Sequence, residues 1–168
     1  MKRQKQPALA LPVVDFLDTC VLVEVLNVPF MNERRDAVVA EMERRKQEGV
    51  KFVLPTATVI ETGNHVFQVK DGRARRKCAD AYTHLLRATA EGRAPWRLHE
   101  RTWDAALLNA LCEGGVTGMS LTEHAVRKQL GTGDLSIVAE RDMYAERVQA
   151  KVRIWTLEAT MQTWAEIP

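Results

Sequence analysis

The chain has 168 residues, of which 46% are hydrophobic and 27% charged, and its formal net charge at pH 7 is +2. This composition excludes an extended disordered chain, and a chain of this length buries a core without disulfide bonds. A net charge this small identifies no partner, so an argument for nucleic-acid binding must rest on where basic residues cluster. We expect one globular domain over residues 1–168.

The cysteines and the apolar runs indicate the cellular compartment. Cys20, Cys78 and Cys112 are odd in number, far apart and without Cys-x-x-Cys spacing, which argues against a disulfide framework and a thiolate zinc site. No apolar run reaches the roughly 18 residues that a membrane span needs. Residues 1–7 lack the long apolar segment of a signal peptide. We therefore expect a cytoplasmic protein with no membrane association.

The first predicted element is a short apolar strand that starts near Leu11 and ends at Asp18 and Thr19. A run that is apolar on both faces is typical of a central parallel strand, and such strands place ligand chemistry at their carboxyl ends. Asp18 would then lie at the mouth of a site. Alternatively, Asp18 only caps a helix that begins near Val21, and this segment alone leaves both interpretations open. No metal-binding role is expected for Asp15, which lies earlier on the strand.

Helices and short strands alternate through the middle of the chain. Residues 32–48 are predicted to form a helix that Gly49 ends, and residues 51–55 a strand. Thr56 is expected to cap the helix that follows over residues 57–69.

The second half continues this alternation. It is predicted to contain, in chain order, a helix over 71–91, a short strand over 96–99, helices over 102–112 and 120–130, a helix that begins at Asp134, and a strand over 151–158. Thr102 is expected to cap its helix and Gly114 to end it, while Ser120 and Glu123 form a capping box. Short strands alternating with helices indicate an α/β fold with a mainly parallel sheet.

Four acids occupy related positions in these elements. Asp18 follows the first strand, Glu61 lies on the helix after the second, Asp134 starts a late helix, and Glu158 ends the last strand. In a parallel sheet the carboxyl ends of the strands and the amino ends of the following helices share one edge, so these carboxylates can converge. Such a cluster repels itself unless it is protonated or metal-bound, and Mg²⁺ or Mn²⁺ prefers hard oxygen ligands. A metal ion there could activate water and offset charge on a phosphodiester.

Four short motifs resemble those of the PIN domain, the fold of VapC-type toxin ribonucleases and related metal-dependent RNA nucleases. The matching pieces are Asp18-Thr19 with Val21-Leu22, Thr58 with Glu61, the helical segment 134–139, and Thr156 with Glu158. Their order covers nearly the whole chain. The resemblance implies a three-layer α/β/α sandwich that binds one or two Mg²⁺ or Mn²⁺ ions and hydrolyses RNA as an endoribonuclease.

The resemblance also implies roles for individual residues. Asp18, Glu61 and Asp134 would be the main catalytic and metal-binding acids. Glu158 would be the fourth, at a position where this family more often has Asp, and this departure bears on the second metal position.

Other residues would support these acids or bind RNA. The resemblance implies that Thr19 or Thr156 orients water or carboxylates, and Asn64, on the same helix face as Glu61, could contact phosphate or only pair with nearby backbone. A dense basic cluster is either a solvated helix face or a phosphate-binding surface; it comprises Lys70, Arg73, Arg75, Arg76 and Lys77.

The resemblance implies partners as well. A VapC-like toxin would have RNA as substrate, a small antitoxin protein as partner in a type II toxin–antitoxin pair, and a homodimeric state. Two alternatives stay open: a non-catalytic PIN-like module that binds RNA or protein, and a phosphohydrolase acting on small phosphoesters.

Overall fold

The computed structural model describes residues 10–167. Its centre is a sheet of four parallel strands in the order β3-β2-β1-β4. The strands are β1 (Val13–Leu17), β2 (Lys51–Leu54), β3 (Trp96–Leu98) and β4 (Lys151–Trp155). In this register Phe16 of β1 lies opposite Val53 of β2 and Ile154 of β4. The expectations for the segment 1–7 fall outside the described residues.

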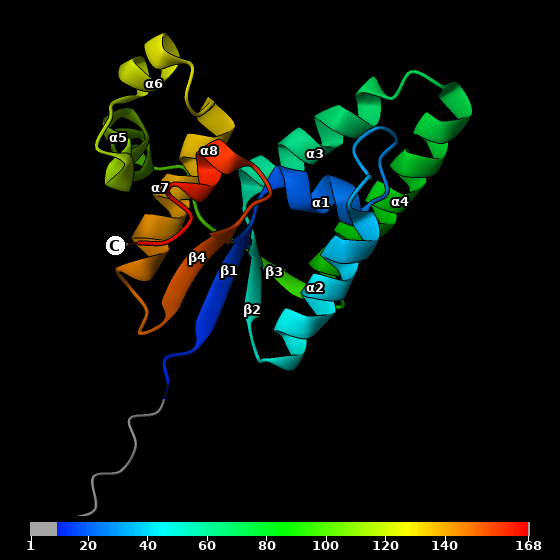
Figure 1. Cartoon of the computed structure of the whole chain (residues 1–168), viewed down its shortest axis with the longest axis horizontal. Coiled ribbons are helices and arrows are strands. Elements are labelled where there is room, and N and C mark those ends of the chain that lie inside the picture. The colour runs from blue at the N-terminus through cyan, green and yellow to red at the C-terminus, as the bar shows by residue number, and fades with distance from the viewer. Residues whose placement is uncertain (1–9, 168) are drawn as a thin grey trace, which may run out of the picture.

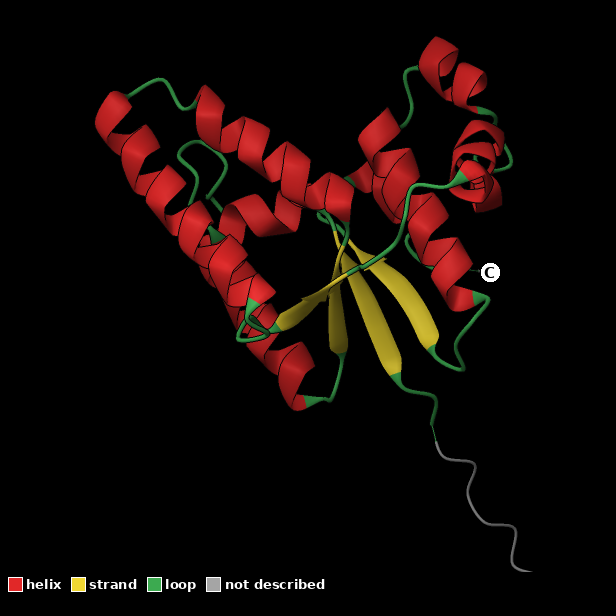
Figure 2. Ribbon diagram, turned by 180° about the vertical axis from the view of Figure 1, so that it is seen from behind, coloured by secondary structure: helices red, strands yellow, loops and turns green. Residues whose placement is uncertain are grey.

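Helices lie on both sides of the sheet (Figure 1). Their bounds are α1 (Thr19–Val25), α2 (Arg35–Gln47), α3 (Thr56–Gln68), α4 (Gly72–Ala90), α5 (Ala105–Glu113), α6 (Leu121–Arg127), α7 (Thr132–Ala145) and α8 (Ala159–Gln162), with a 3₁₀ turn over Gly115–Thr117. Seen from behind, the strands lie between two separate groups of helices (Figure 2). The predicted α/β class and its three-layer α/β/α arrangement are therefore confirmed. No helix within residues 10–167 is both long and apolar enough to cross a membrane.

Alternating side chains of the sheet divide the core between its two faces. Leu17 and Leu54 pack toward α1–α4, in the same cluster as Leu22 and Val66. Other strand side chains pack toward α5, α7 and α8 on the opposite face; among them are Phe16, Val53, Val152 and Ile154, which contact Ile137 and Met161. Burial of these apolar side chains from two layers holds the sheet between its helices.

The direction of the chain connections changes between β1 and β4. The connections from β1 to β2 and from β2 to β3 run through α1–α4 on one face, whereas the connection from β3 to β4 runs through α5–α7 on the other. In open α/β sheets, ligands bind in the crevice outside the carboxyl ends of the strands at such a switch point. Here that crevice lies beyond Leu17 and Trp155.

Several predicted helix starts are wrong. α1 begins at Thr19 rather than near Val21, so Asp18 occupies its N-cap position. Thr56 does not cap α3, because it is already the first helical residue, and Pro55 takes the cap position without a side-chain hydrogen bond. The fixed φ of proline and its missing N–H suit it to the start of a helix.

The later boundaries also differ from the prediction. Asp104, not Thr102, caps α5 by accepting a hydrogen bond from Leu107 N at 2.9 Å. The predicted helix 120–130 ends at Arg127, because Lys128 adopts a left-handed conformation with φ 51°. Its capping box at Ser120 is confirmed, as is the end of α5 at Gly114, which adopts a left-handed conformation.

Three further boundaries differ from the prediction. α2 begins at Arg35 rather than at residue 32, and α7 begins at Thr132 rather than at Asp134. β4 ends at Trp155, so Glu158 is not on the strand but in the N-cap position of α8, a helix that was not predicted.

Candidate functional site

Asp18 links the end of the central strand to the start of α1. Its side chain is buried, and its Oδ1 accepts a hydrogen bond from Thr19 N at 2.6 Å. Thr156 Oγ1 donates to Oδ2 at 2.6 Å, and Asp18 N donates to Trp155 O at 3.1 Å. Asp18 is therefore both a helix cap and a rigidly held carboxylate at the switch point.

Glu61 comes to the same place from α3. Thr58 Oγ1 donates to Leu17 O at 2.7 Å, which ties the first turn of α3 to the end of β1. One turn later, Glu61 Oε2 accepts from Thr19 Oγ1 at 2.8 Å. Glu61 Oε1 lies so close to Gly133 of α7 that a Cβ at that position would collide with it. The Glu61 carboxylate can therefore occupy this position only because residue 133 is a glycine.

Asp134 enters the site from the first turn of α7. Its Oδ2 accepts a hydrogen bond from Gly131 N at 3.2 Å, which fixes the carboxylate at the helix start. Burial raises the pKa of Asp134 to about 6, and the negative charges of Asp18, Glu158 and Glu61 act in the same direction. A raised pKa is expected for a carboxyl group that is partly buried beside other carboxylates.

Glu158 lies at the rim of the site, three residues after β4. Its backbone N–H donates to Thr156 Oγ1 at 3.1 Å, so the same hydroxyl contacts both Asp18 and the Glu158 backbone. Partial burial raises the pKa of Glu158, with the charges of Asp18 and Glu61 contributing.

All four acids line one pocket of about 300 Å³. The other residues around it are Thr19, Cys20, Met31, Asn64, His65 and Gln68. Of the predicted supporting residues, Thr19 and Asn64 thus line the pocket, whereas Thr156 lies behind Asp18 and is buried. Sequence reasoning assigned the four acids to one edge of the sheet, and the structure brings them together there.

Cys20 is a pocket residue that sequence reasoning missed. Its Sγ donates to Asp18 Oδ2 at 3.1 Å and accepts from Leu157 N at 3.1 Å. Burial, followed by the charge of Asp18, raises the pKa of the Cys20 thiol to about 12. The group is therefore a neutral hydrogen-bond donor to the carboxylate. Its spacing of two residues from Asp18 was the only available signal.

The donor set suits a hard divalent cation. Carboxylate oxygens from Asp18, Glu61, Asp134 and Glu158 face one pocket, and the hydrogen bonds to Glu61 and Asp134 each engage a single oxygen within the described residues. Among residues 10–167, no group of three or more His, Cys, Asp or Glu side chains has the geometry of a metal site. Like-charged carboxylates repel one another, which opposes such close clustering.

The basic cluster lies where α3 passes into α4. Lys70 is in the connection, the other four residues are in the first turns of α4, and Arg75 Nη1 donates to Val69 O at 2.9 Å. None of the five forms an ion pair with a residue in 10–167. In contrast, Arg44 and Arg45 of α2 pair with Glu41. The positive charge of the cluster is therefore not neutralised by neighbouring acids.

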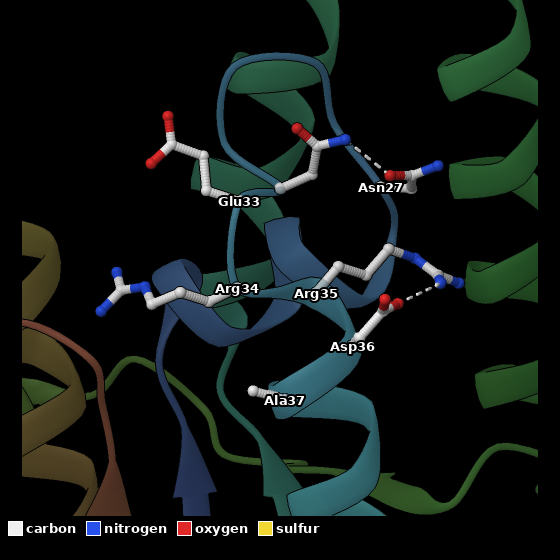
Figure 3. A pocket seen from close by; sticks show the side chains of 7 residues that line it. Asn27, Glu33, Arg34, Arg35, Asp36 and Ala37 are labelled. Carbon is white, nitrogen blue, oxygen red and sulfur yellow. Dashed lines mark hydrogen bonds and ion pairs between the residues drawn. The ribbon is translucent and has the colours of Figure 1, made fainter.

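A wider hollow of about 600 Å³ lies around the start of α2 (Figure 3). Its charges are mixed: Arg35 approaches Asp36 at 3.9 Å, and Arg34 pairs with the buried Glu24 at 3.6 Å. It contains none of the predicted site residues. The size of a hollow therefore does not select the candidate site, which is chosen for the four carboxylates that line it.

No protein-family model matches the chain, and no curated protein is significantly similar to it. The functional argument therefore rests on the residues of the pocket and their surroundings.

Proposed function

We propose that the chain is a Mg²⁺- or Mn²⁺-dependent endoribonuclease with a PIN-like site. In this proposal Asp18, Glu61 and Asp134 bind the cation and Glu158 assists from the rim. The observation that supports it best is the meeting of four carboxylates from distant segments in one pocket at the switch point of the sheet. Burial and, after it, the charges of the neighbouring acids raise the pKa of Asp134, and a cation would offset the part that comes from those charges.

A buried acid outside the pocket shows how this chain neutralises a structural carboxylate. Asp15, in the middle of β1, accepts from Arg153 Nε at 2.7 Å and Nη2 at 2.8 Å, and from Arg45 Nη1 at 2.7 Å. No arginine or lysine lines the pocket with the four acids, although Arg34 beside it and His65 within it act on Glu158 through their charges. A buried charge such as that of Asp18 requires a partner, and a bound cation would supply it.

The chain's own residues would hold the reacting groups. Thr156 and the Thr19 backbone fix the two oxygens of Asp18, while the Thr19 hydroxyl fixes Glu61. Glu158, exposed and with a raised pKa, is placed to accept a proton from an attacking water. A bound divalent cation would activate that water and offset the charge that develops on the phosphate.

The test is cleavage of single-stranded RNA by the purified chain with Mg²⁺, Mn²⁺ or EDTA. We expect cleavage with either metal and none in EDTA. Asp18→Asn should lower the rate by at least about 100-fold, since removal of one ligand charge disrupts cation binding. The matched control is Asp36→Asn, because Asp36 is a fully exposed acid outside the pocket. Circular dichroism should show both variants folded.

Other outcomes would select other functions. Undiminished cleavage by Asp18→Asn would contradict the site assignment. Intact RNA together with no Mn²⁺ binding by calorimetry would favour a non-catalytic binding module. Hydrolysis of an aryl phosphate without RNA cleavage would favour a small-molecule phosphohydrolase. If cleavage occurs, growth arrest on expression that disappears with Asp18→Asn would support the further proposal of a toxin with an antitoxin partner.

A further inference from the structure

The carboxylate pocket continues into a second hollow along α3. This hollow, of about 420 Å³, shares Met31, His65 and Gln68 with the carboxylate pocket. Its remaining lining includes Phe30 and Lys70. A third hollow, of about 530 Å³, also has Phe30 in its lining and lies between the segment 26–33 and α4. We refer to the two hollows beside Phe30 together as the Phe30 groove.

Phe30 stands at the centre of this groove in an unusual conformation. Its side chain is 95% exposed, and its backbone φ is 66°, in the left-handed region that a bulky residue rarely adopts. The surrounding loop is held by two hydrogen bonds. Asn32 Nδ2 donates to Asn27 Oδ1 at 2.7 Å (Figure 3), and Met31 N donates to Val28 O at 3.0 Å. The loop thus exposes an aromatic ring to solvent in a strained backbone conformation, and this arrangement suits a binding role.

Positive charge flanks this ring in both hollows. Lys70 lines the hollow nearer the carboxylates, and Lys77 lines the hollow against α4, where Glu33 is the one acid in the lining. Neither lysine forms an ion pair with any residue of the described chain. An exposed aromatic ring between free cations matches single-stranded nucleic acid, whose bases stack on aromatic side chains while its phosphates attract lysine.

We propose that the Phe30 groove binds a single strand of nucleic acid beside the scissile phosphate, with one base stacked on Phe30 and the backbone near Lys70 and Lys77. This inference rests on the proposed function, because the strand continues from the carboxylate pocket through the shared residues. It specifies an unpaired substrate, since a base within a duplex cannot present its face to a side chain.

The test is equilibrium binding of labelled single strands of about 12 nucleotides, a length within the range of single-strand sites. RNA and DNA of one sequence are compared by fluorescence anisotropy in EDTA, so that binding is measured apart from cleavage. Phe30→Ala should weaken binding at least about fivefold, whereas Phe30→Trp should retain it, because stacking requires an aromatic face. Lys70→Gln and Lys77→Gln should each lower the salt dependence by roughly one ion.

Phe67→Ala is the matched control, because Phe67 is a 72% exposed aromatic residue of α3 that lines neither hollow. Its binding should equal that of the wild type. Equal binding by Phe30→Ala and the wild type would overturn the inference, as would equal losses in the Phe30 and Phe67 variants. Normal strand binding by Phe30→Ala with lost self-association in sedimentation would instead assign the groove to a second copy of the chain.

The nuclease proposal and the Phe30 groove proposal can be contradicted independently. A wild-type protein that never cleaves RNA contradicts the nuclease proposal, whereas a Phe30 that does not affect strand binding contradicts only this inference. Tighter binding of RNA than of DNA would support a groove that also contacts 2′-hydroxyls, and equal binding would support stacking common to both strands.

Discussion

Asp15 and Asp18 are both buried in the same short segment, yet their surroundings give them different roles. Asp15 faces two arginines, and it is neutralised within the protein. Asp18 receives its hydrogen bonds from uncharged groups and lies beside other carboxylates. Hydrogen bonds from hydroxyl and backbone groups orient Asp18 without cancelling its charge, so it keeps the capacity to bind a cation.

The raised pKa of Asp134 predicts how pH acts on the metal-free protein. Its pKa is about 6, against a usual value of 3.8, so the folded state binds this proton more tightly than the unfolded state. The contribution to stability is therefore greatest below about pH 4 and is lost as pH rises through about 6. In EDTA, the Tm of the wild type relative to Asp134→Asn should rise as pH falls from about 7.5 to about 5.

Mn²⁺ binding should depend on pH in the opposite direction, because it should weaken as pH falls. The cation competes with the proton on Asp134, so Mn²⁺ affinity should fall by up to about tenfold for each pH unit below 6. Calorimetric titrations of Mn²⁺ across this pH range measure the effect. Parallel Tm curves for the wild type and Asp134→Asn, or affinity independent of pH, would contradict the prediction.

At the scale of elements, the crossing of α3 and α7 places Glu61 against Gly133. In Gly133→Ala the new Cβ would meet Glu61 Oε1 and displace this carboxylate. We expect Mn²⁺ affinity to fall at least about tenfold, a loss typical of disturbed ligand positioning. Stability should change little, because alanine favours the helix by up to about 1 kcal/mol, which offsets part of the clash.

Gly72→Ala is the control for this substitution. Gly72 lies at the first position of α4, and a Cβ there would meet its nearest neighbour, Arg75 Nη2, at 3.9 Å, an ordinary contact. Mn²⁺ affinity should therefore be unchanged. Wild-type affinity in Gly133→Ala would show that the Glu61 carboxylate is not a ligand.

The elements and the convergence of the acids could be predicted because their signals are local. An apolar run that stops at Asp18, and a strand followed by a helix carrying Glu61, place both groups at one edge of a parallel sheet. Helix starts were less predictable, because Asp104 and Thr102 are both good caps and only the packing of α5 selects Asp104.

Other site features depend on tertiary structure alone. For Cys20 the sequence argued only against a disulfide or zinc role, and only the return of β4 places its thiol between Asp18 and Leu157. Phe30 is an apolar residue that composition assigns to the core, and only the loop conformation holds it in solvent. α8 has four residues, which is too few for a helical period to be recognised in the sequence.

For the whole molecule, the Asp15 cluster joins two strands of the sheet to one of the covering helices. It connects β1 to β4 through Arg153 and to α2 through Arg45, whose guanidinium also lies 4.4 Å from the centre of the Trp155 ring. Asp15→Ala would leave two arginines without their shared carboxylate, at a cost of about 3 kcal/mol. For a chain of this size the Tm should fall by roughly 6–12 °C.

Urea unfolding of Asp15→Ala and of the exposed control Asp36→Ala measures this cost. Asp36→Ala should stay within about 0.5 kcal/mol of the wild type, because its side chain is fully exposed. Mn²⁺ affinity per folded molecule should be unchanged in both variants, since Asp15 does not line the carboxylate pocket. Wild-type stability in Asp15→Ala would show that the arginines are solvated equally well without it. Lost Mn²⁺ binding in a folded Asp15→Ala would instead mean that β1 transmits the change to Asp18, which directly follows the strand.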